Sequence, residues 1–121
     1  MLPKTHRLRL KKDFDRIFKR GKFISHKFFT AGFAANDLPV SRMTVVVAKK
    51  VSKSAVIRNS VKRKATEVLR LNLVKIKTGF DMVFLVKPEI KGKNYWEIEK
   101  AIIDILKTAK LIPFTVNGIE P

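Results

Sequence analysis

The segment KKVSKSAVIRNSVKRKATE, residues 49–67, constrains the fold of this chain more than any other. Helical spacing, with Ser54 as a candidate N-cap, predicts a helix over residues 54–71. Its apolar face is Ile57, Val61, Ala65, Val68 and Leu69. The other side carries lysine, arginine and asparagine, which a core cannot accommodate. We therefore expect a surface helix that packs by one face and presents its basic face to an anionic partner.

The residues before this helix predict a short helix followed by strands. Apolar residues recur at i, i+3 and i+4 within residues 11–20, and Gly21 suits the end of that helix. Residues 22–35 are strand-like, with every second side chain of 29–35 on one face. A hairpin turn is expected over residues 36–41, before an interior strand over 43–49.

The residues after the basic helix predict one more strand and one more helix. The run FDMVFLVK, residues 80–87, is apolar enough for a buried strand and ends at Pro88. Asn94 and Glu97 have the spacing of a capping box, and Pro113 marks the end of the helix that they begin. Helix, strands, helix, strand and helix in this order indicate a mixed α+β domain with its helices on one side of a sheet.

The net charge of +17 is unevenly distributed over the 121 residues. It is +7 over residues 1–37, +10 over residues 38–80 and zero over residues 81–121. The first two thirds are thus suited to face phosphates. We expect one domain over residues 1–121, with a loosely held basic arm at 1–10 and a tail at 111–121.

Composition excludes several classes of protein. Without cysteine the chain has no disulfides or thiolate metal sites. Its apolar runs, such as residues 82–86, are too short to cross a bilayer, and residues 1–10 do not resemble a signal peptide. We expect a cytoplasmic protein without a membrane partner.

The basic segment resembles the signature of the bacterial ribonuclease P protein subunit. The family motif is a strand that ends in Lys-Lys, then a turn, then a helix with Arg-Asn and Lys-Arg. The corresponding pairs here are Lys49–Lys50, Arg58–Asn59 and Lys62–Arg63. The resemblance covers roughly residues 6–110, including the basic start at Leu10–Phe14. The chain departs from the family at Ser60 and Thr66, where arginine is usual, and at Ser52, where glycine is common.

The resemblance implies a fold and a function. The fold is a small α–β sandwich of order αβββαβα, with a central, mostly antiparallel sheet and a left-handed βαβ crossover through the basic helix. The function is that of an RNA-binding subunit of a ribonucleoprotein endonuclease, which removes the 5′ leader from precursor tRNA. The catalytic RNA supplies the active site with Mg²⁺. The protein has no catalytic residue, no metal cluster and no small-molecule substrate of its own.

The resemblance also implies two sets of site residues. The residues expected to bind the RNA subunit are Lys49, Lys50, Lys53, Arg58, Asn59, Lys62 and Arg63. The residues expected to bind the leader, as stacking aromatics with nearby cations, are Phe14, Phe18, Lys12, Arg16, Phe29 and Phe33.

Two alternatives remain open from the sequence. A ribosomal or general RNA-chaperone protein would explain the charge but not the Arg-Asn-x-x-Lys-Arg pattern. An autonomous ribonuclease would need an acid–base pair, and no spacing brings together His6 and His26, the two histidines of the chain.

Overall fold

A computed structural model describes residues 2–112 and forms a four-stranded sheet with three α-helices. The strands are β1 (Lys22–Ser25), β2 (Phe29–Ala35), β3 (Arg42–Val46) and β4 (Phe80–Val86). The helices are α1 (Lys11–Arg20), α2 (Ala55–Leu71) and α3 (Tyr95–Thr108). The expected order αβββαβα is therefore confirmed. Both predicted caps are also present, because Ser54 accepts from the Ile57 N–H and Asn94 accepts from the Glu97 N–H.

The strand-like segment 22–35 is two strands rather than one. β1 and β2 pair antiparallel, with Phe23 opposite Gly32, and the chain turns between them at residues 26–28. The Lys87 ammonium donates to the Ser25 hydroxyl and to the His26 carbonyl, which fixes this turn to the end of β4. The turn reverses the chain, so β1 places its own side chains beside those of β2.

The expected hairpin over residues 36–41 is wrong. The strand order is β1-β2-β4-β3, so β4 lies between β2 and β3. β4 pairs antiparallel with β2 and parallel with β3. The physical reason is burial, since the apolar β4 is covered on both faces and takes an inner position. β3 then lies at the edge of the sheet, and α2 makes the crossover that a parallel pair requires.

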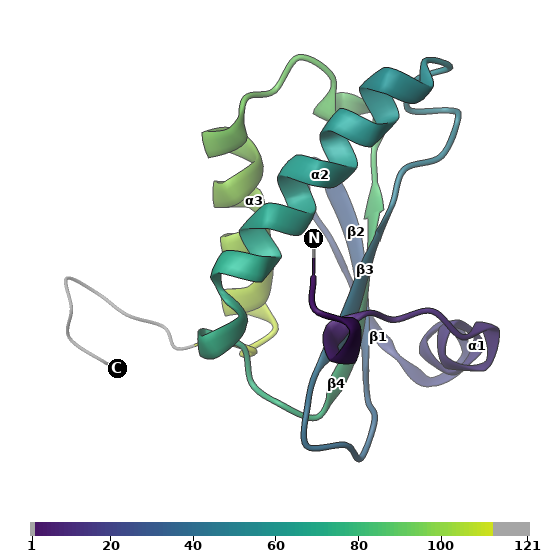
Figure 1. Cartoon of the computed structure of the whole chain (residues 1–121), viewed down its shortest axis with the longest axis vertical. Coiled ribbons are helices and arrows are strands. Elements are labelled where there is room, and N and C mark those ends of the chain that lie inside the picture. The colour runs from purple at the N-terminus through teal and green to yellow at the C-terminus, as the bar shows by residue number, and fades with distance from the viewer. Residues whose placement is uncertain (1, 113–121) are drawn as a thin grey trace, which may run out of the picture.

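The helices cover both faces of the sheet, which corrects the expectation that they lie on one side. Figure 1 shows α2 and α3 on one side of the strands and α1 on the other. Most of the core lies under α2 and α3, where Val68, Leu69 and Ile102 are fully buried. A smaller cluster of Leu8, Ile17 and Val83 lies under α1. Ile57, expected in the apolar face of α2, is 44% exposed near the start of that helix.

Two segments at the ends of elements are tightly packed. Gly21 follows α1 where a Cβ atom would lie 2.4 Å from the Ile17 carbonyl oxygen, so the close approach of backbone requires glycine. Leu111 and Ile112 are buried, and the Leu111 carbonyl accepts from the Lys77 N–H at 2.6 Å. The remainder of the expected tail, residues 113–121, lies outside the described residues.

Candidate RNA interface

The basic face of α2 is formed by side chains three and four residues apart. Asn59, Lys62 and Arg63 are exposed, and Thr66 one turn further on is half-buried. Val61, Ala65, Val68 and Leu69 on the other side of the helix are buried. Such spacing places 59, 62, 63 and 66 on one helix surface. The structure thus brings together three of the residues expected to bind the RNA subunit.

The turn before α2 presents three more of these residues. Lys49, Lys50 and Lys53 are exposed, while Val51 between them is fully buried and anchors the turn. Arg58 has a different role from the lysines. Its Nη1 donates to the Ser52 and Lys53 carbonyls at 2.9 and 3.0 Å, so it holds the turn in shape.

The N-terminal segment packs against the sheet, although the sequence suggests a loosely held arm. Leu2 and Leu8 are buried, and the Leu8 N–H donates to the Met43 carbonyl at the free edge of β3. The Nδ1 atom of His6 lies 2.8 Å from the Ser41 carbonyl oxygen. Sequence reasoning missed the burial of these two leucines, because Lys4, Arg7 and Arg9 make the segment strongly basic. This segment, residues 2–9, lies beside α2 and extends its basic surface.

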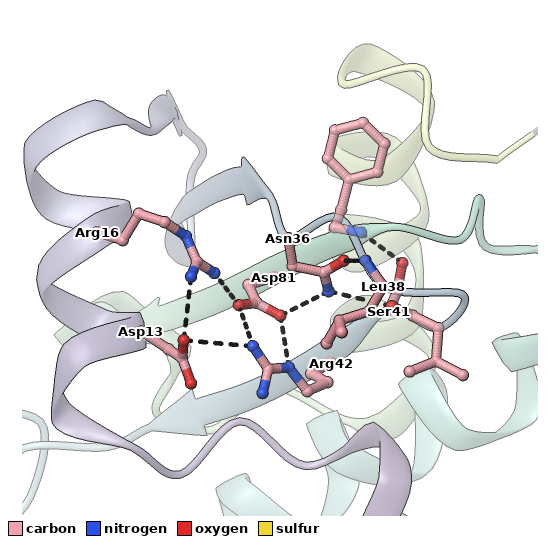
Figure 2. Close-up of polar contacts among 9 residues, drawn as sticks. Asp13, Arg16, Asn36, Leu38, Ser41, Arg42 and Asp81 are labelled. Atoms are coloured by element: carbon pink, nitrogen blue, oxygen red, sulfur yellow. Dashed lines mark hydrogen bonds and ion pairs between the residues drawn. The ribbon is translucent and has the colours of Figure 1, made fainter.

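A buried network of charges attaches α1 to the other face of the sheet (Figure 2). Asp81 in β4 is fully buried and accepts from Arg16 of α1, from Arg42 of β3 and from Asn36. Asp13 of α1 is also buried and pairs with both guanidinium groups. Hydrogen bonding to Asp81 raises the pKa of the Arg42 guanidinium above its ordinary value. This network is the main feature that sequence reasoning missed, and an aspartate inside an apolar strand run was its only signal.

Arg16, expected to contact the leader, is part of that network. Its guanidinium is bound to Asp13 and Asp81, so its charge is compensated within the protein. Arg16 therefore positions α1. Lys12, on the same helix, is exposed and forms no ion pair with an acid within residues 2–112. Lys11 by contrast pairs with Asp15 at the surface.

The aromatic residues expected to bind the leader divide between the two faces of the sheet. Phe18 of α1 is 53% exposed, and Phe14 is half-buried against the small cluster under α1. Phe29 is fully buried in the core under α2 and α3, and Phe33 packs against the same core. Alternate residues of a strand point to opposite faces, so Gly32 and not Phe33 faces α1. Phe29 and Phe33 are thus not brought together with Phe14 and Phe18, which corrects that part of the expected site.

Phe23 of β1 is a candidate site residue that the sequence did not reveal. Its ring stacks on Phe18, with centroids 5.7 Å apart and planes inclined by 21°, and it is 42% exposed. The ring also covers Gly32, because a Cβ atom there would lie 2.5 Å from the Phe23 Cε2 atom. A single strand over residues 22–35, as the sequence predicts, could not place Phe23 opposite Gly32. The polar residues 25–27 were the available sign of a turn.

Within residues 2–112 the structure holds no group of three or more histidine, cysteine, aspartate or glutamate side chains suited to a metal ion. Over the same residues, none of the helices has the length and apolar character needed to cross a membrane.

Comparison with known proteins identifies the family. The family model "Ribonuclease P" matches residues 2–110. A ribonuclease P protein component of Clostridium botulinum is 41% identical over 107 residues, which cover 88% of this chain and 96% of that protein. The corresponding protein of Alkaliphilus metalliredigens is 36% identical over 108 residues, covering 89% of this chain and 96% of that protein.

Solved structures agree with the sequence relatives. A Staphylococcus aureus ribonuclease P protein, in a mutant described as defective in mRNA degradation, superposes with a TM-score of 0.84 at 26% identity, covering 90% of this chain and 92% of that one. The Thermotoga maritima protein superposes with a TM-score of 0.77 at 33% identity, covering 84% and 96%. The chain therefore belongs to the bacterial ribonuclease P protein family, the protein component of a ribonucleoprotein endonuclease in tRNA processing.

Proposed function

We propose that this protein assists the catalytic RNA in removing the 5′ leader of precursor tRNA by means of two separate surfaces. The basic face of α2 and the preceding turn dock on the RNA subunit. The surface between α1 and the sheet holds the single-stranded leader. The assembly works in the cytoplasm, and the RNA subunit holds the Mg²⁺ ions and performs the cleavage.

The exposed stack of Phe18 on Phe23 is the observation that carries the leader proposal. Two large aromatic rings left 53% and 42% exposed are a cost to a protein without a partner. Unpaired bases stack on such rings whatever their sequence, which suits leaders that differ between precursors. Lys12 and Lys19 on α1 are exposed and can attract the leader backbone.

The docking proposal is supported by uncompensated charge on α2. Glu67 is the single acidic residue of that helix, and it forms a bidentate pair with Arg70, at 2.8 and 2.6 Å. Lys62 and Arg63 have no acidic residue on α2 left to compensate them. A phosphate backbone would relieve their mutual repulsion and release its counterions.

Cleavage of a 5′-extended precursor tRNA at low magnesium tests the proposal. The reactions compare the protein alone, a bacterial ribonuclease P RNA alone and the two combined. We expect a single cut at the mature 5′ end, fast only in the combined reaction. Cutting by the protein alone would indicate an autonomous ribonuclease. Failure to stimulate several different ribonuclease P RNAs would favour a general RNA-chaperone role.

A further inference from the structure

The Lys87 ammonium is held at the end of the sheet by two uncharged groups. Lys87 follows β4 with an extended backbone, and its Nζ atom donates to the Ser25 hydroxyl at 2.9 Å and to the His26 carbonyl at 2.5 Å. An ammonium has three N–H donors, so one remains after these two bonds. Within residues 2–112, Lys87 forms no ion pair with an acid. Its charge is therefore oriented by the protein without being compensated.

Lys87 lies on the face of the sheet that carries α1. Alternate residues of an extended chain point to opposite faces. Val83 of β4 packs in the small cluster under α1, so Lys87, four residues further on, points to the same side. Phe23 of β1 faces α1 as well, because its ring stacks on Phe18, and Ser25 follows two residues later. The bond between Lys87 and Ser25 is thus on the face of the proposed leader surface.

The sheet face between the aromatic stack and Lys87 is only partly covered. Figure 1 shows α1 beside the lower part of the strands, away from the end of β4. Beyond α1, this face carries Thr30 and Leu85, which are paired across β2 and β4 and are both partly exposed. Position 32, beside Phe23, and position 28, beside Lys87, are separated by four residues, roughly 13 Å in an extended strand. A single strand stacked on Phe23 can follow this face as far as Lys87.

An uncompensated ammonium in this position favours an anionic partner. Lys87 is half-buried, so part of its hydration is lost, and its two acceptors carry no charge. The same acceptors fix the long side chain before a ligand binds, which lowers the entropy cost of binding. A phosphate oxygen of an unpaired strand supplies the missing charge and accepts the third N–H.

We propose that Lys87 binds one backbone phosphate of the leader, at the opposite end of the sheet face from the stack of Phe18 on Phe23. This inference rests on the proposed leader surface and adds a second contact of different chemistry. The stack holds bases of any sequence, and the ammonium fixes the path of the backbone. Two contact points define the direction in which the leader crosses the sheet, which a single stack does not.

Neutral substitution of single phosphates tests this contact directly. Precursor tRNAs carry one methylphosphonate at successive leader positions, and their affinities for the holoenzyme are measured. We expect Lys87→Met to lower the affinity for unmodified precursor roughly tenfold, the size of one lost charge-assisted hydrogen bond. One methylphosphonate that weakens binding to the wild-type holoenzyme should have no further effect in Lys87→Met. If every methylphosphonate weakens both proteins equally, Lys87 contacts no leader phosphate and the proposal fails.

Three further variants separate the phosphate contact from a purely structural role. Lys87→Arg keeps the charge and should preserve the response to the critical methylphosphonate. Ser25→Ala removes only an orienting hydroxyl and should weaken that response in part. Lys91→Met removes one charge from an exposed position after β4 and is the control. Circular dichroism establishes that the variants are folded.

The salt dependence of precursor binding gives a second reading. Loss of one phosphate contact to a single strand lowers the slope of log affinity against log salt by about 0.7. We expect this decrease in Lys87→Met and not in Lys91→Met. An unchanged slope, with all precursors weakened by the same factor, would show that Lys87 only holds the turn and would overturn the proposal.

Precursor and mature tRNA together distinguish this inference from the leader proposal. Equal affinities of the wild-type holoenzyme for the two would overturn both. A preference for precursor that Phe18→Ala reduces and Lys87→Met leaves intact would overturn the Lys87 contact and retain the aromatic surface.

Discussion

The Asp81 carboxylate of β4 accepts two hydrogen bonds from the Arg42 guanidinium of β3, at 2.9 Å from Nε and 2.7 Å from Nη2 (Figure 2). The same carboxylate accepts from Arg16 of α1. One buried acid therefore connects the edge strand, the inner strand and the helix that carries Phe18. The position of the proposed leader surface depends on this connection.

Asp81→Asn should destabilise the fold strongly. The substitution leaves Asp13 alone to compensate two guanidinium groups, and loss of one partner from a buried ion pair typically costs about 3–5 kcal/mol. Urea unfolding monitored by circular dichroism measures the change. Asp15→Asn, which breaks the exposed pair with Lys11, is the matched control and should change the free energy of unfolding by less than about 1 kcal/mol. Similar small effects for both variants would show that the network contributes little.

Phe18→Ala and Phe23→Ala should each weaken binding of precursor tRNA to the holoenzyme. Loss of one base–aromatic stacking contact is worth about 1–3 kcal/mol, so we expect roughly a tenfold loss of affinity. Mature tRNA, which has no leader, should bind as before. Trp96→Ala removes an aromatic that is 69% exposed on α3 and is the control. Equal losses for precursor and mature tRNA would contradict leader stacking.

An aromatic ring beside position 32 should support precursor binding whether position 23 or position 32 carries it. Phe23 and Gly32 are directly opposite in the β1–β2 ladder, and the Phe23 ring occupies the space beside Gly32. We expect Phe23→Ala combined with Gly32→Tyr to recover much of the precursor affinity lost in Phe23→Ala. Gly32→Tyr alone should crowd Phe23 and lower affinity. The four-member double-mutant cycle, measured by precursor binding, must show favourable coupling for this interpretation to stand.

The double variant Lys62→Ala, Arg63→Ala should reduce the salt dependence of RNA-subunit binding. Loss of two phosphate contacts lowers the slope of log affinity against log salt by roughly 1.5. Binding titrations at several potassium concentrations measure the slope. Lys75→Ala with Lys91→Ala removes the same charge from exposed positions outside the basic face. If the two double variants have the same slope, α2 makes no special contribution to docking.

The stability of the fold should fall as the pH decreases through about 6.5, with His26 as one cause. Burial lowers the pKa of His26 from its ordinary 6.5, the charges of Lys87, Lys100 and Lys27 add to the decrease, and Asp104 opposes it. The unfolded chain therefore binds a proton at His26 more readily than the folded chain does. The stability that this difference contributes is present above about pH 6.5 and is lost as the pH falls toward the lower pKa of the folded protein. The Nδ1 atom is buried without a hydrogen-bond partner in the described structure, which agrees with a neutral ring.

Urea unfolding at several pH values between about 5 and 8, a range that spans ordinary histidine titration, checks this prediction. His26→Gln should unfold with a smaller change in stability over the range, and His6→Gln provides the comparison with the other histidine. A wild-type profile that matches His26→Gln throughout would exclude a contribution from His26.

Local patterns in the sequence predicted the helices well. The apolar faces of α2 and α3, the caps at Ser54 and Asn94 and the exposed cations of α2 all follow from 3.6-residue periodicity and from capping chemistry. The signature pairs placed the basic helix in its family. These features depend on residues within a few positions of one another, so the sequence contains them directly.

Strand neighbours and the second surface required the tertiary structure. A periodicity of two identifies a strand but not its partner, so it could not place β4 between β2 and β3. For the same reason the periodicity did not predict the turn between β1 and β2. It therefore did not predict that the Phe23 ring lies over Gly32.

The amino-acid sequence by itself thus determined the three helices, the apolar strand segments and the charged face that we propose docks on RNA. Only the tertiary structure decided which aromatic residues share a surface and that Asp81 unites two arginines from distant segments. The reason is that helical faces and caps arise from short-range geometry. Strand pairing and buried ion networks instead join residues far apart in the chain, and packing selects among many locally acceptable pairings.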